Sequence, residues 1–445
     1  MRDTSVCLQE IGDGNAGKVR FGRFLRNRQV SFEEMFETAA EQAAAGVAGR
    51  HVLAIEDTSE INFEAHRGRV RGLGPVGNGH DLGFFVHPLL GVDAGTGGVI
   101  GLIGGTIYKR SGKPARSRHA RPLAEKESAR WIRTAEAAMP RLSAADTVTV
   151  MTDREGDIYA LLSRQAALEA AARAGLAGKG PRVHVLIRAS QDRAIGAGQH
   201  LMSRAASLKL QHRYRIEVPA KPGQKARVAR VGLGFGQVRI RAPRRPDSKG
   251  LPPETELAMV VVREIDPPVG LEPVNWVLLT SHAVADPEAA LAIVGWYKKR
   301  WLIEQLFRLI KTDGLDLEAS QITTGRALMN LAAAALIAAT RVLQLVQARD
   351  GNTGQKLAEG FSAEQVEVLE AIADRLPGKT AKQSNRHAKD SLAWGAWIIA
   401  RLGGWTGYAS GRPPGPKTIT RGLAKFTTTC EGWSLARKGK NVCLR

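Results

Sequence analysis

The sequence predicts an α/β protein, in which short apolar strands alternate with helices. Two apolar runs, 51–55 and 147–151, have the length and the β-branched content of buried strands, and each ends at polar residues. The segment 183–281 is rich in further strand-like runs. Alanine-rich and amphipathic patterns occupy most of the chain beyond residue 286. A sequence in which strand-like runs alternate with helical patterns is typical of helices packed on a sheet.

The first third of the chain predicts a helix followed by a small sheet. Ser31-Phe-Glu-Glu34 is a helix start, because the serine hydroxyl can cap the first turn, and an alanine-rich helix follows to about Ala48. The next segments alternate between strand, loop and helix. Strands are predicted at His51–Ile55, Phe84–Val92, Val99–Ile103 and Thr147–Met151, an exposed loop at 64–82, a glycine-rich hairpin turn at 94–98, and helices at Glu125–Ala138 and Ile158–Ala174.

The middle of the chain combines strands with an excess of positive charge. Between residues 181 and 250 there are sixteen Lys and Arg but only three acidic residues. A basic β-rich segment is typical of a nucleic-acid-binding surface, although charged side chains also protect solvated strand edges from pairing. Strands are predicted at Val183–Arg188, Arg213–Val218, Arg227–Val231, Gly236–Arg241, Glu256–Val262 and Trp276–Thr280.

Helices dominate the last third. Asp286-Pro287 is a strong helix start, with an N-cap followed by proline in the first turn, and we expect this helix to reach about Lys311. The apolar run 328–339 is too short and too polar to span a bilayer, so we expect a buried helix there. Further helices are predicted at 325–348, 362–375 and 388–402, with a final amphipathic stretch at 422–435.

Composition limits the function classes. The chain has 445 residues, a net charge of +21 and a pI near 10.3, which favours a polyanionic partner, nucleic acid before membrane. The chain has an odd number of cysteines, and they lie far apart in the sequence, at Cys7, Cys430 and Cys443. This argues against a disulfide framework or a zinc site. No signal peptide is visible at the N-terminus. We therefore expect a cytoplasmic protein that binds DNA and no membrane.

The predicted helix 286–311 carries an unusual polar stripe. At roughly 100° per residue, Tyr297, Arg300, Glu304 and Lys311 fall at about 0°, 300°, 340° and 320°, within a stripe about 60° wide. A carboxylate between two cations and a phenol suits a metal ion beside a phosphate backbone. The alternative is an ordinary ion pair on a solvated helix, between Glu304 and Arg300 or Arg308.

Two aspartates follow apolar strands at their carboxyl ends, where ligands usually meet an α/β sheet. The two aspartates, Asp57 and Asp153, together with Glu304 provide three hard oxygen donors, and the sequence has no Cys/His cluster. This donor set suits two Mg²⁺ or Mn²⁺ ions and an in-line displacement at phosphorus. The alternatives are structural. Asp57 could form a turn with Thr58 or Ser59, and Asp153 could cap the helix that follows.

These motifs together resemble DDE transposases of the insertion-sequence-four type, the group that includes the transposon-five transposase. The likeness spans roughly residues 18 to 435. It is carried by Leu53-Ala-Ile-Glu-Asp-Thr-Ser59, by Asp153-Arg-Glu-Gly-Asp-Ile158, and by Tyr297-x2-Arg300-x3-Glu304-x6-Lys311, whose spacing equals the family's YREK signature.

The resemblance implies an RNase H-like catalytic core with a β-strand insert at about 183–281, all within residues 51–340. It implies a shortened helical DNA-binding region at 1–50 and a helical dimerisation region at 341–445. Asp57, Asp153 and Glu304 would be the catalytic metal ligands, and Tyr297, Arg300 and Lys311 would hold phosphates near the cleaved end.

The resemblance also implies roles for three residues around this centre. Trp276 would stack on a flipped base during hairpin formation, with a core strand tryptophan as the alternative. Arg188 matches an arginine near the same pocket. Trp301 could add a second stacking surface or simply pack.

The expected function is cut-and-paste transposition by a homodimer on double-stranded DNA, comprising transposon ends and target. The steps are magnesium-dependent nicking, hairpin formation and strand transfer. Only about 50 residues precede the Asp57 strand, which is shorter than the resemblance leads us to expect. This motivates an alternative, an inactive or inhibitory short form that acts by DNA binding and mixed dimerisation. A further alternative is a structural DNA-binding protein whose acidic residues only balance charge.

Overall fold

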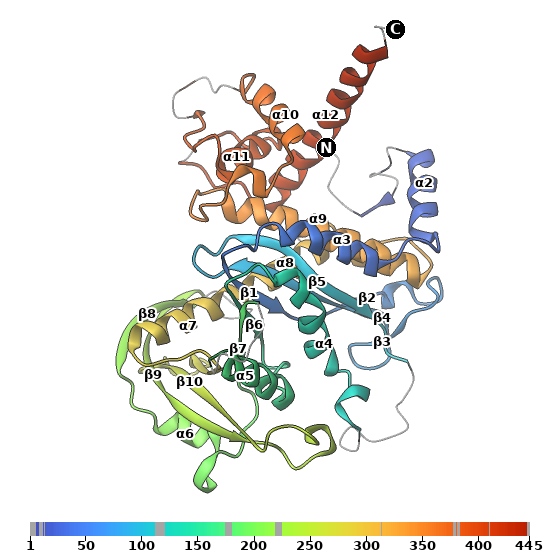
Figure 1. The fold of residues 1–445 in the computed structure, drawn as a ribbon. Helices are drawn as coiled ribbons and strands as arrows, with labels where there is room; N and C mark the ends of the chain where they lie inside the picture. Colours follow the sequence, from blue (N-terminus) through green and yellow to red (C-terminus); the bar gives the residue numbers. More distant parts are fainter. Residues whose placement is uncertain are drawn as a thin grey trace. The chain divides into compact units, whose positions relative to one another are not determined.

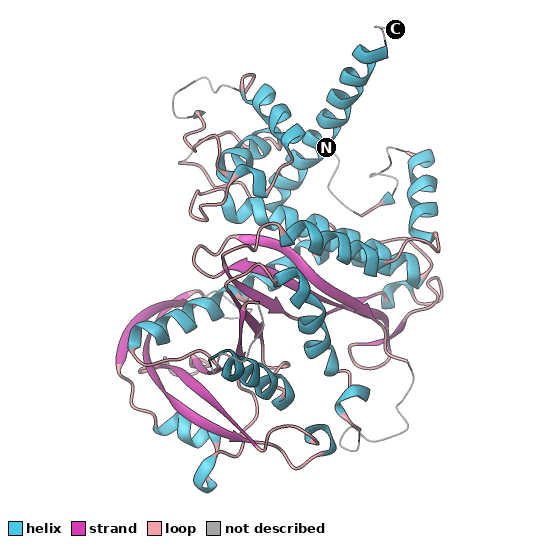
Figure 2. Cartoon of the chain, viewed as in Figure 1, coloured by secondary structure: helices cyan, strands magenta, loops and turns pink. Residues whose placement is uncertain are grey.

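The α/β class is confirmed. The protein, a computed structural model, combines helices with a large mixed sheet (Figures 1 and 2). The structure describes residues 6–8, 12, 14–111, 121–173, 180–218, 225–312, 314–376, 380, 383–408 and 410–442.

The chain divides into two compact units that alternate along the sequence. Unit 1 comprises Met1–Gly46, Thr58–Ser111 and Leu302–Arg445, and unit 2 comprises Val47–Asp57 and Gly112–Trp301. The chain therefore passes between the units directly after Asp57 and again directly after Trp301. The predicted domain boundaries at residues 50 and 340 stay predictions.

Unit 1 contains an antiparallel set of strands with helices on it. β4 pairs with β2, β3 and β5, and helices α3 and α9 pack against β5 (Figure 1). The serine predicted to start α3 is confirmed as its cap, because the Ser31 hydroxyl accepts a hydrogen bond from the Glu34 amide. The elements of this unit include α2 (Asn15–Arg26), α3 (Phe32–Ala44), β2 (Ser59–Asn62), β3 (Gly74–Val76), β4 (Asp81–Asp93), β5 (Val99–Tyr108), α9 (Gly325–Ala348), α10 (Ala363–Ala373), α11 (Leu392–Leu402) and α12 (Pro416–Val442).

Unit 2 is built on one continuous set of strands, in the order β1-β6-β7-β11-β10-β9-β8. The first three strands run parallel to one another, and the remaining pairs are antiparallel. Helix α5 packs on β7 and β10, and helix α7 packs on β9 and β10. The elements are β1 (His51–Glu56), α4 (Ala129–Ala138), β6 (Thr147–Thr152), α5 (Tyr159–Arg173), β7 (Arg182–Arg188), α6 (Leu201–Ser207), β8 (His212–Val218), β9 (Arg227–Arg241), β10 (Glu254–Glu264), β11 (Asn275–Thr280) and α7 (Pro287–Lys299).

The core of unit 2 lies between the strands and helices α4 and α5. Trp131 of α4 is 1% exposed and packs with Val150 of β6 and Leu161 of α5. These apolar side chains hold the strands and the loops after them in fixed positions. Two of the candidate site residues, Asp57 and Asp153, lie directly after strands β1 and β6.

The structure corrects two predicted elements. Residues 227–231 and 236–241 belong to one long strand, β9, because glycines 232 and 234 leave room for the segment 208–210, which crosses them. A Cβ on Gly232 would lie 2.5 Å from Leu210. The predicted helix 286–311 is two helices, α7 and α8 (Trp301–Lys311), with a turn at Arg300 between them.

The short strands β2 and β3 and the short helix α6 were not predicted. The predicted loop at 64–82 contains β3, and the predicted helix at 158–174 is confirmed as α5 up to Arg173, with residue 174 outside the described residues. The stretch predicted at 422–435 is part of the longer helix α12.

Helix α9 is longer than the apolar run at its centre. Its 24 residues make it long and apolar enough to cross a membrane by length and composition, which corrects the expectation that this segment is too short. In the structure 67% of its most apolar window is buried. The predicted burial is therefore confirmed, and α9 packs as a core helix of unit 1.

We predict that the Asp286 cap contributes measurably to stability. The Asp286 carboxylate accepts a hydrogen bond of 2.8 Å from the Ala289 amide at the start of α7. Asp286→Ala should lower the free energy of unfolding in urea by about 1 kcal/mol, because a helix amide loses its acceptor. Asp286→Asn keeps an acceptor and should lose less. Glu288→Ala, in the same turn, is the control, and an equal loss in both alanine variants would contradict a capping role.

Candidate catalytic site

Asp57 and Asp153 follow neighbouring parallel strands at the same level. In the pairing of β1 with β6, Ile55 lies opposite Met151, and each aspartate comes two residues further along the chain, directly after its strand ends. Because the strands are parallel, both carboxyl ends meet one edge of the sheet. The register therefore puts the two aspartates side by side at that edge.

The Asp57 carboxylate has a cationic partner. Its Oδ2 accepts a hydrogen bond of 3.0 Å from the guanidinium of Arg300, and the two side chains are only 13% and 15% exposed. Arg300 stands in the turn between α7 and α8, which brings it back to the end of β1. A charge pair this sheltered from water is stronger than an exposed one. Two of the predicted site residues are thus in direct contact.

Asp153 forms a local turn. Its Oδ1 accepts a hydrogen bond of 2.7 Å from the amide of Glu155, which fixes the chain as it leaves β6. Helix α5 begins only at Tyr159, so the alternative in which Asp153 caps that helix is wrong. The second carboxylate oxygen is not used in this turn bond.

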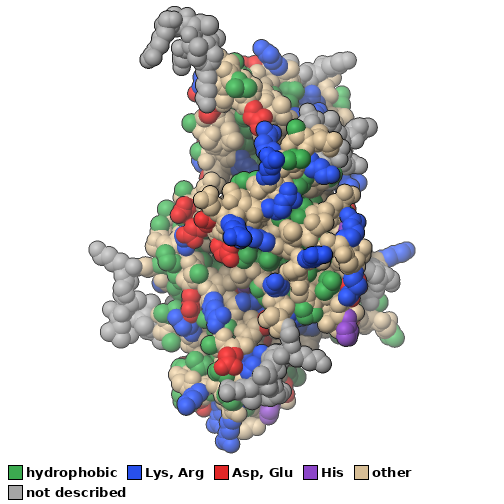
Figure 3. All heavy atoms as spheres, turned by 90° about the vertical axis from the view of Figure 1, so that its right-hand side faces the viewer, with side chains coloured by type: hydrophobic (Ala, Val, Ile, Leu, Met, Phe, Trp, Pro, Cys, Tyr) green, Lys and Arg blue, Asp and Glu red, His purple; other side chains and the backbone are tan. Residues whose placement is uncertain are grey.

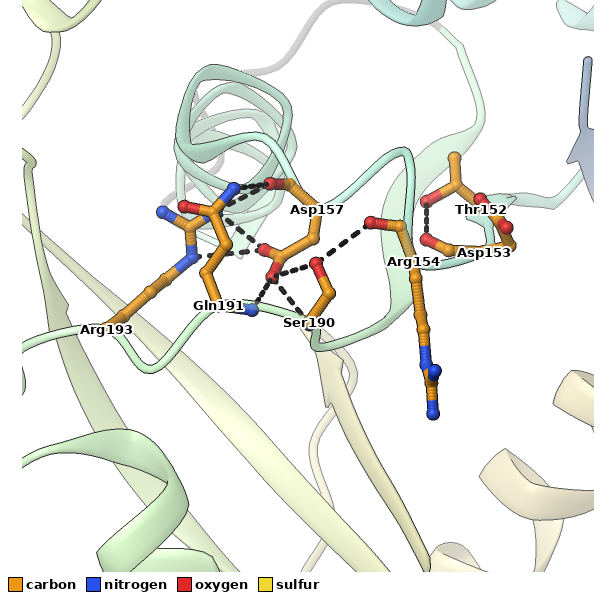
Figure 4. Close-up of polar contacts among 7 residues, drawn as sticks. All are labelled: Thr152, Asp153, Arg154, Asp157, Ser190, Gln191 and Arg193. Carbon is orange, nitrogen blue, oxygen red and sulfur yellow. Dashed lines mark hydrogen bonds and ion pairs between the residues drawn. The ribbon is translucent and has the colours of Figure 1, made fainter. Parts of the chain in front are cut away.

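The same loop is fastened by a buried acid, Asp157, which is 2% exposed. Its carboxylate accepts hydrogen bonds from the amides of Ser190 and Gln191, and it pairs with the Arg193 guanidinium at 2.6 Å (Figure 4). The Ser190 hydroxyl also donates to the Arg154 carbonyl at 3.0 Å. These contacts join the loop after β6 to the loop after β7.

Figure 4 shows the consequence for the motif 153–158. Asp157 is turned into this network, whereas Asp153 lies apart from it beside Thr152, and the Arg154 side chain extends away from both. The motif thus contains one acid that pins the loop and another that the loop presents at the strand end. Sequence reasoning gave Asp157 no role.

A pocket of about 720 Å³ lies in unit 2 next to Arg300. Three aromatic side chains line it, Trp276, Tyr297 and Trp301, and its lining has five Lys or Arg but only two Glu. The Trp276 and Tyr297 rings meet edge to face with centroids 5.8 Å apart. The basic lining residues are Arg154, Arg188, Arg227, Lys298 and Arg300. Aromatic faces inside a basic pocket suit a nucleotide.

The register explains why Arg188 faces this pocket. Arg188 ends β7, and its neighbour Ile187 lies opposite Thr152 of β6, so Arg188 is level with Asp153. On its other side β7 pairs with β11, where Arg188 lies opposite Leu278, two residues from Trp276. Arg188 therefore stands between the strand end that carries Asp153 and the strand that carries Trp276.

Burial has opposite consequences for two pocket groups. It lowers the pKa of the Arg188 guanidinium, and the charge of Arg154 lowers it further. It raises the pKa of the Tyr297 phenol, partly offset by Arg300. The phenol is therefore neutral at physiological pH, and the guanidinium groups repel one another, so an anion that entered between them would be stabilised.

Trp276 is half-buried and lines the pocket with part of its surface. Trp301 is 46% exposed, which argues against the alternative that it simply packs in the core. Both indoles therefore have surface that a planar ligand can contact.

Glu304 and Lys311 belong to unit 1, on helix α8. Glu304 is half-buried in the first turn of α8, and Lys311 ends that helix, where its ammonium lies 3.8 Å from the Glu318 carboxylate. The helix break at Arg300 means that the predicted stripe is shared between two helices. The joint role of Glu304 with the two aspartates stays a prediction.

The donor atoms fit a hard cation. Within the part of the chain that the structure describes, no group of three or more His, Cys, Asp or Glu residues gathers into a metal-binding cluster. What the strand ends offer is a level pair of carboxylates, Asp57 and Asp153, and carboxylate oxygens are the ligands that Mg²⁺ and Mn²⁺ prefer.

Burial also affects the residue before Asp57. Glu56 ends β1, is fully buried, and has its pKa raised well above the usual value by that burial, against the opposing charge of Arg130. The neighbouring pair Arg130 and Glu155 is 3.3 Å apart.

On the molecular surface, Lys and Arg side chains are spread over the face drawn in Figure 3, with smaller groups of Asp and Glu among them.

Of the family models compared with this sequence, none matches.

We predict that Asp157 is a structural acid. Asp157→Ala should lower the free energy of unfolding by about 3–5 kcal/mol, because it leaves the Arg193 guanidinium buried without its carboxylate. Urea unfolding followed by tryptophan fluorescence measures this. Asp390→Ala is the matched control, since it breaks an ion pair of equal length, 2.6 Å, whose side chains are 68% and 66% exposed, and it should change stability little. Equal losses in the two variants would contradict the assignment.

Proposed function

We propose that this protein is a DDE-type transposase that cuts and joins DNA by metal-dependent phosphoryl transfer. One observation supports this most directly. Asp57 and Asp153 leave the carboxyl ends of two adjacent parallel strands at the same level, beside a basic pocket with aromatic walls. The motif spacing of Tyr297, Arg300, Glu304 and Lys311 is the second support.

The finer fold belongs to this proposal. Residues 51–340 would form an RNase H-like catalytic domain, in which the parallel strands β1, β6 and β7 provide the strand ends. The antiparallel strands β8 to β11 would be the main part of the insert at about 183–281. Residues 341–445 would be used for dimerisation.

Asp57, Asp153 and Glu304 would hold the cations, two Mg²⁺ or Mn²⁺ ions. When bound, such ions activate the attacking hydroxyl and stabilise the leaving oxygen. Two of the three acids already share one sheet edge, and the place of Glu304 in the set rests on the motif spacing. Asp157 takes no part, because its carboxylate is used inside the protein.

The cations of the site would orient the DNA backbone. Arg300 contacts Asp57 at 3.0 Å, so a phosphate bound by this guanidinium would lie next to a metal-binding carboxylate. Arg188 carries its charge at the level of Asp153. Tyr297, a neutral phenol, would donate a hydrogen bond to a phosphate oxygen, and Lys311 would add a further positive charge.

Trp276 would receive the base that leaves the duplex when the end forms a hairpin. Unstacking a base costs free energy, and an aromatic face recovers part of it. The edge-to-face contact with Tyr297 holds the indole in place while part of it lines the pocket. Trp301, 46% exposed, would be a second stacking surface.

The substrates in this proposal are double-stranded transposon ends and target DNA, and the acting form is a homodimer. The sequence of events is nicking, hairpin formation, hairpin opening and strand transfer. The net charge of +21 supports a DNA partner, and we place the activity in the cytoplasm, on the nucleoid.

We predict that each of the three acids is needed for cleavage but not for DNA binding. On a pre-nicked duplex with the element's terminal repeat, Asp57→Asn, Asp153→Asn and Glu304→Gln should each slow hairpin formation by about 1,000-fold or more, equivalent to about 4 kcal/mol of transition-state stabilisation. Gel-shift affinity should stay close to that of the unmodified protein.

Asp146→Asn is the matched control, because this exposed acid stands directly before β6, at the opposite end from Asp153. It should cleave normally. If the unmodified protein leaves nicked ends unprocessed in Mg²⁺ and in Mn²⁺, or if all three variants keep the same substantial activity, the enzyme proposal is wrong.

Trp276 gives a prediction that separates two steps of the reaction. Trp276→Ala should slow hairpin formation by about 10- to 100-fold, the range expected for one lost base–aromatic stack, and should slow the first nick much less. Quenched time courses that resolve nicked and hairpin DNA measure both rates. Trp276→Phe keeps a ring and should recover part of the loss. Equal slowing of both steps would indicate a packing role instead.

A further inference from the structure

A buried histidine in unit 1 contacts the residue that follows Asp57. His87 of β4 is fully buried, and its Nδ1 lies 2.8 Å from the hydroxyl oxygen of Thr58. This is the length of a good hydrogen bond, in which either the hydroxyl or the imidazole N–H donates, depending on the tautomer of the ring.

The register of the paired strands explains why Thr58 and His87 are in contact. β2 pairs with β4 so that Ser59 lies opposite Val86, and the residue before Ser59 therefore comes level with His87. β4 is held on its other side by β5, where His87 lies opposite Thr106. The imidazole is fixed by the interior of a sheet, so its bond to Thr58 acts as an anchor for the chain at that residue.

Thr58 is the first residue after Asp57. Each residue of the backbone has only two freely rotating dihedral angles, φ and ψ. An anchored Thr58 therefore restricts the rotations at Asp57 that set the direction of its carboxylate. The chain also passes from unit 2 to unit 1 at this peptide bond. Arg300 also restrains the carboxylate, because its guanidinium lies 3.0 Å from Oδ2 of Asp57.

We propose that Thr58 and His87 are positioning residues for Asp57, and that they act through the hydrogen bond between them to aim its carboxylate at the metal ion. This inference rests on the proposed function. It assigns to a buried histidine a role in metal affinity, which neither its burial nor its distance along the chain from Asp57 would suggest.

Metal binding by the full-length chain tests the proposal without reference to turnover. In Mn²⁺ titrations followed by electron paramagnetic resonance, Thr58→Val should weaken the affinity of the site by about 10-fold, within the range known for residues that orient metal ligands. Valine has nearly the shape of threonine and removes only the hydroxyl. Thr58→Ser retains the hydroxyl and should bind Mn²⁺ within about twofold of the unmodified protein.

A control distinguishes positioning from loss of stability. Thr340→Val removes another buried hydroxyl of unit 1, which donates to the Leu336 carbonyl at 2.8 Å on α9. It should lower the unfolding midpoint without changing Mn²⁺ affinity. His87→Leu removes the ring nitrogen that contacts the Thr58 hydroxyl and should weaken Mn²⁺ affinity about as much as Thr58→Val does. In the double variant Thr58→Val/His87→Leu the losses of affinity should not add, because both act through one bond.

The outcomes separate this inference from the proposed function. If Asp57→Asn abolishes Mn²⁺ binding while Thr58→Val leaves the affinity within twofold, the positioning role is overturned and the catalytic proposal stands. If Asp57→Asn leaves Mn²⁺ binding unchanged, Asp57 is not a ligand and both are overturned. A 10-fold loss in Thr58→Val, restored in Thr58→Ser and absent in Thr340→Val, supports the inference. The Mg²⁺ concentration for half-maximal cleavage should rise in parallel.

Discussion

The parallel register of β1 and β6 is the constraint on which the site depends. With Ile55 opposite Met151, two aspartates that are nearly a hundred residues apart in sequence leave the sheet at one level. A shift of one residue in this pairing would turn one of the side chains to the other face of the sheet. The apolar core beneath, with Trp131 at 1% exposure, opposes such a shift because it would expose buried side chains to water. The same logic continues outward through β7 and β11, which carry Arg188 and Trp276 to neighbouring positions.

Charge is distributed in this site according to burial. Asp157 and Arg193 are almost completely enclosed and neutralise each other, so they fix a loop and have no capacity left for a ligand. Asp57 and Arg300 are sheltered but retain about one seventh of their exposure, which leaves both in reach of a metal ion or a phosphate. Arg188 lies in a pocket where cations outnumber acids, and its lowered pKa reflects the cost of holding that charge away from water. A phosphodiester entering the pocket would remove this cost.

The sequence was sufficient for the features that are local. It predicted the strands before Asp57 and Asp153, the caps at Ser31 and Asp286, and the pocket residue Trp276 on a strand, because periodicity and capping depend on neighbours in the chain. It missed contacts between distant segments. Asp157 contacts Arg193, which is 36 residues away in the sequence, and Thr58 contacts His87, which is 29 residues away. These contacts depend on how distant loops and strands meet, and no local sequence pattern encodes that. The sequence also predicted α7 and α8 as a single helix, because the turn at Arg300 keeps helical dihedral angles (φ −53°, ψ −30°) and does not interrupt the hydrophobic pattern.

The central claim is that Asp57 and Asp153 hold one metal ion between them, and replacement of Mg²⁺ by Fe²⁺ tests it most directly. With ascorbate and peroxide, bound Fe²⁺ generates hydroxyl radicals that cut the backbone close to the ion. We expect cuts around residues 57 and 153 in the same reaction, both lost in Asp57→Asn, and cuts near residue 304 as well if Glu304 is the third ligand. Cutting at only one of the two strand ends, or a pattern unchanged in Asp57→Asn, would contradict the account.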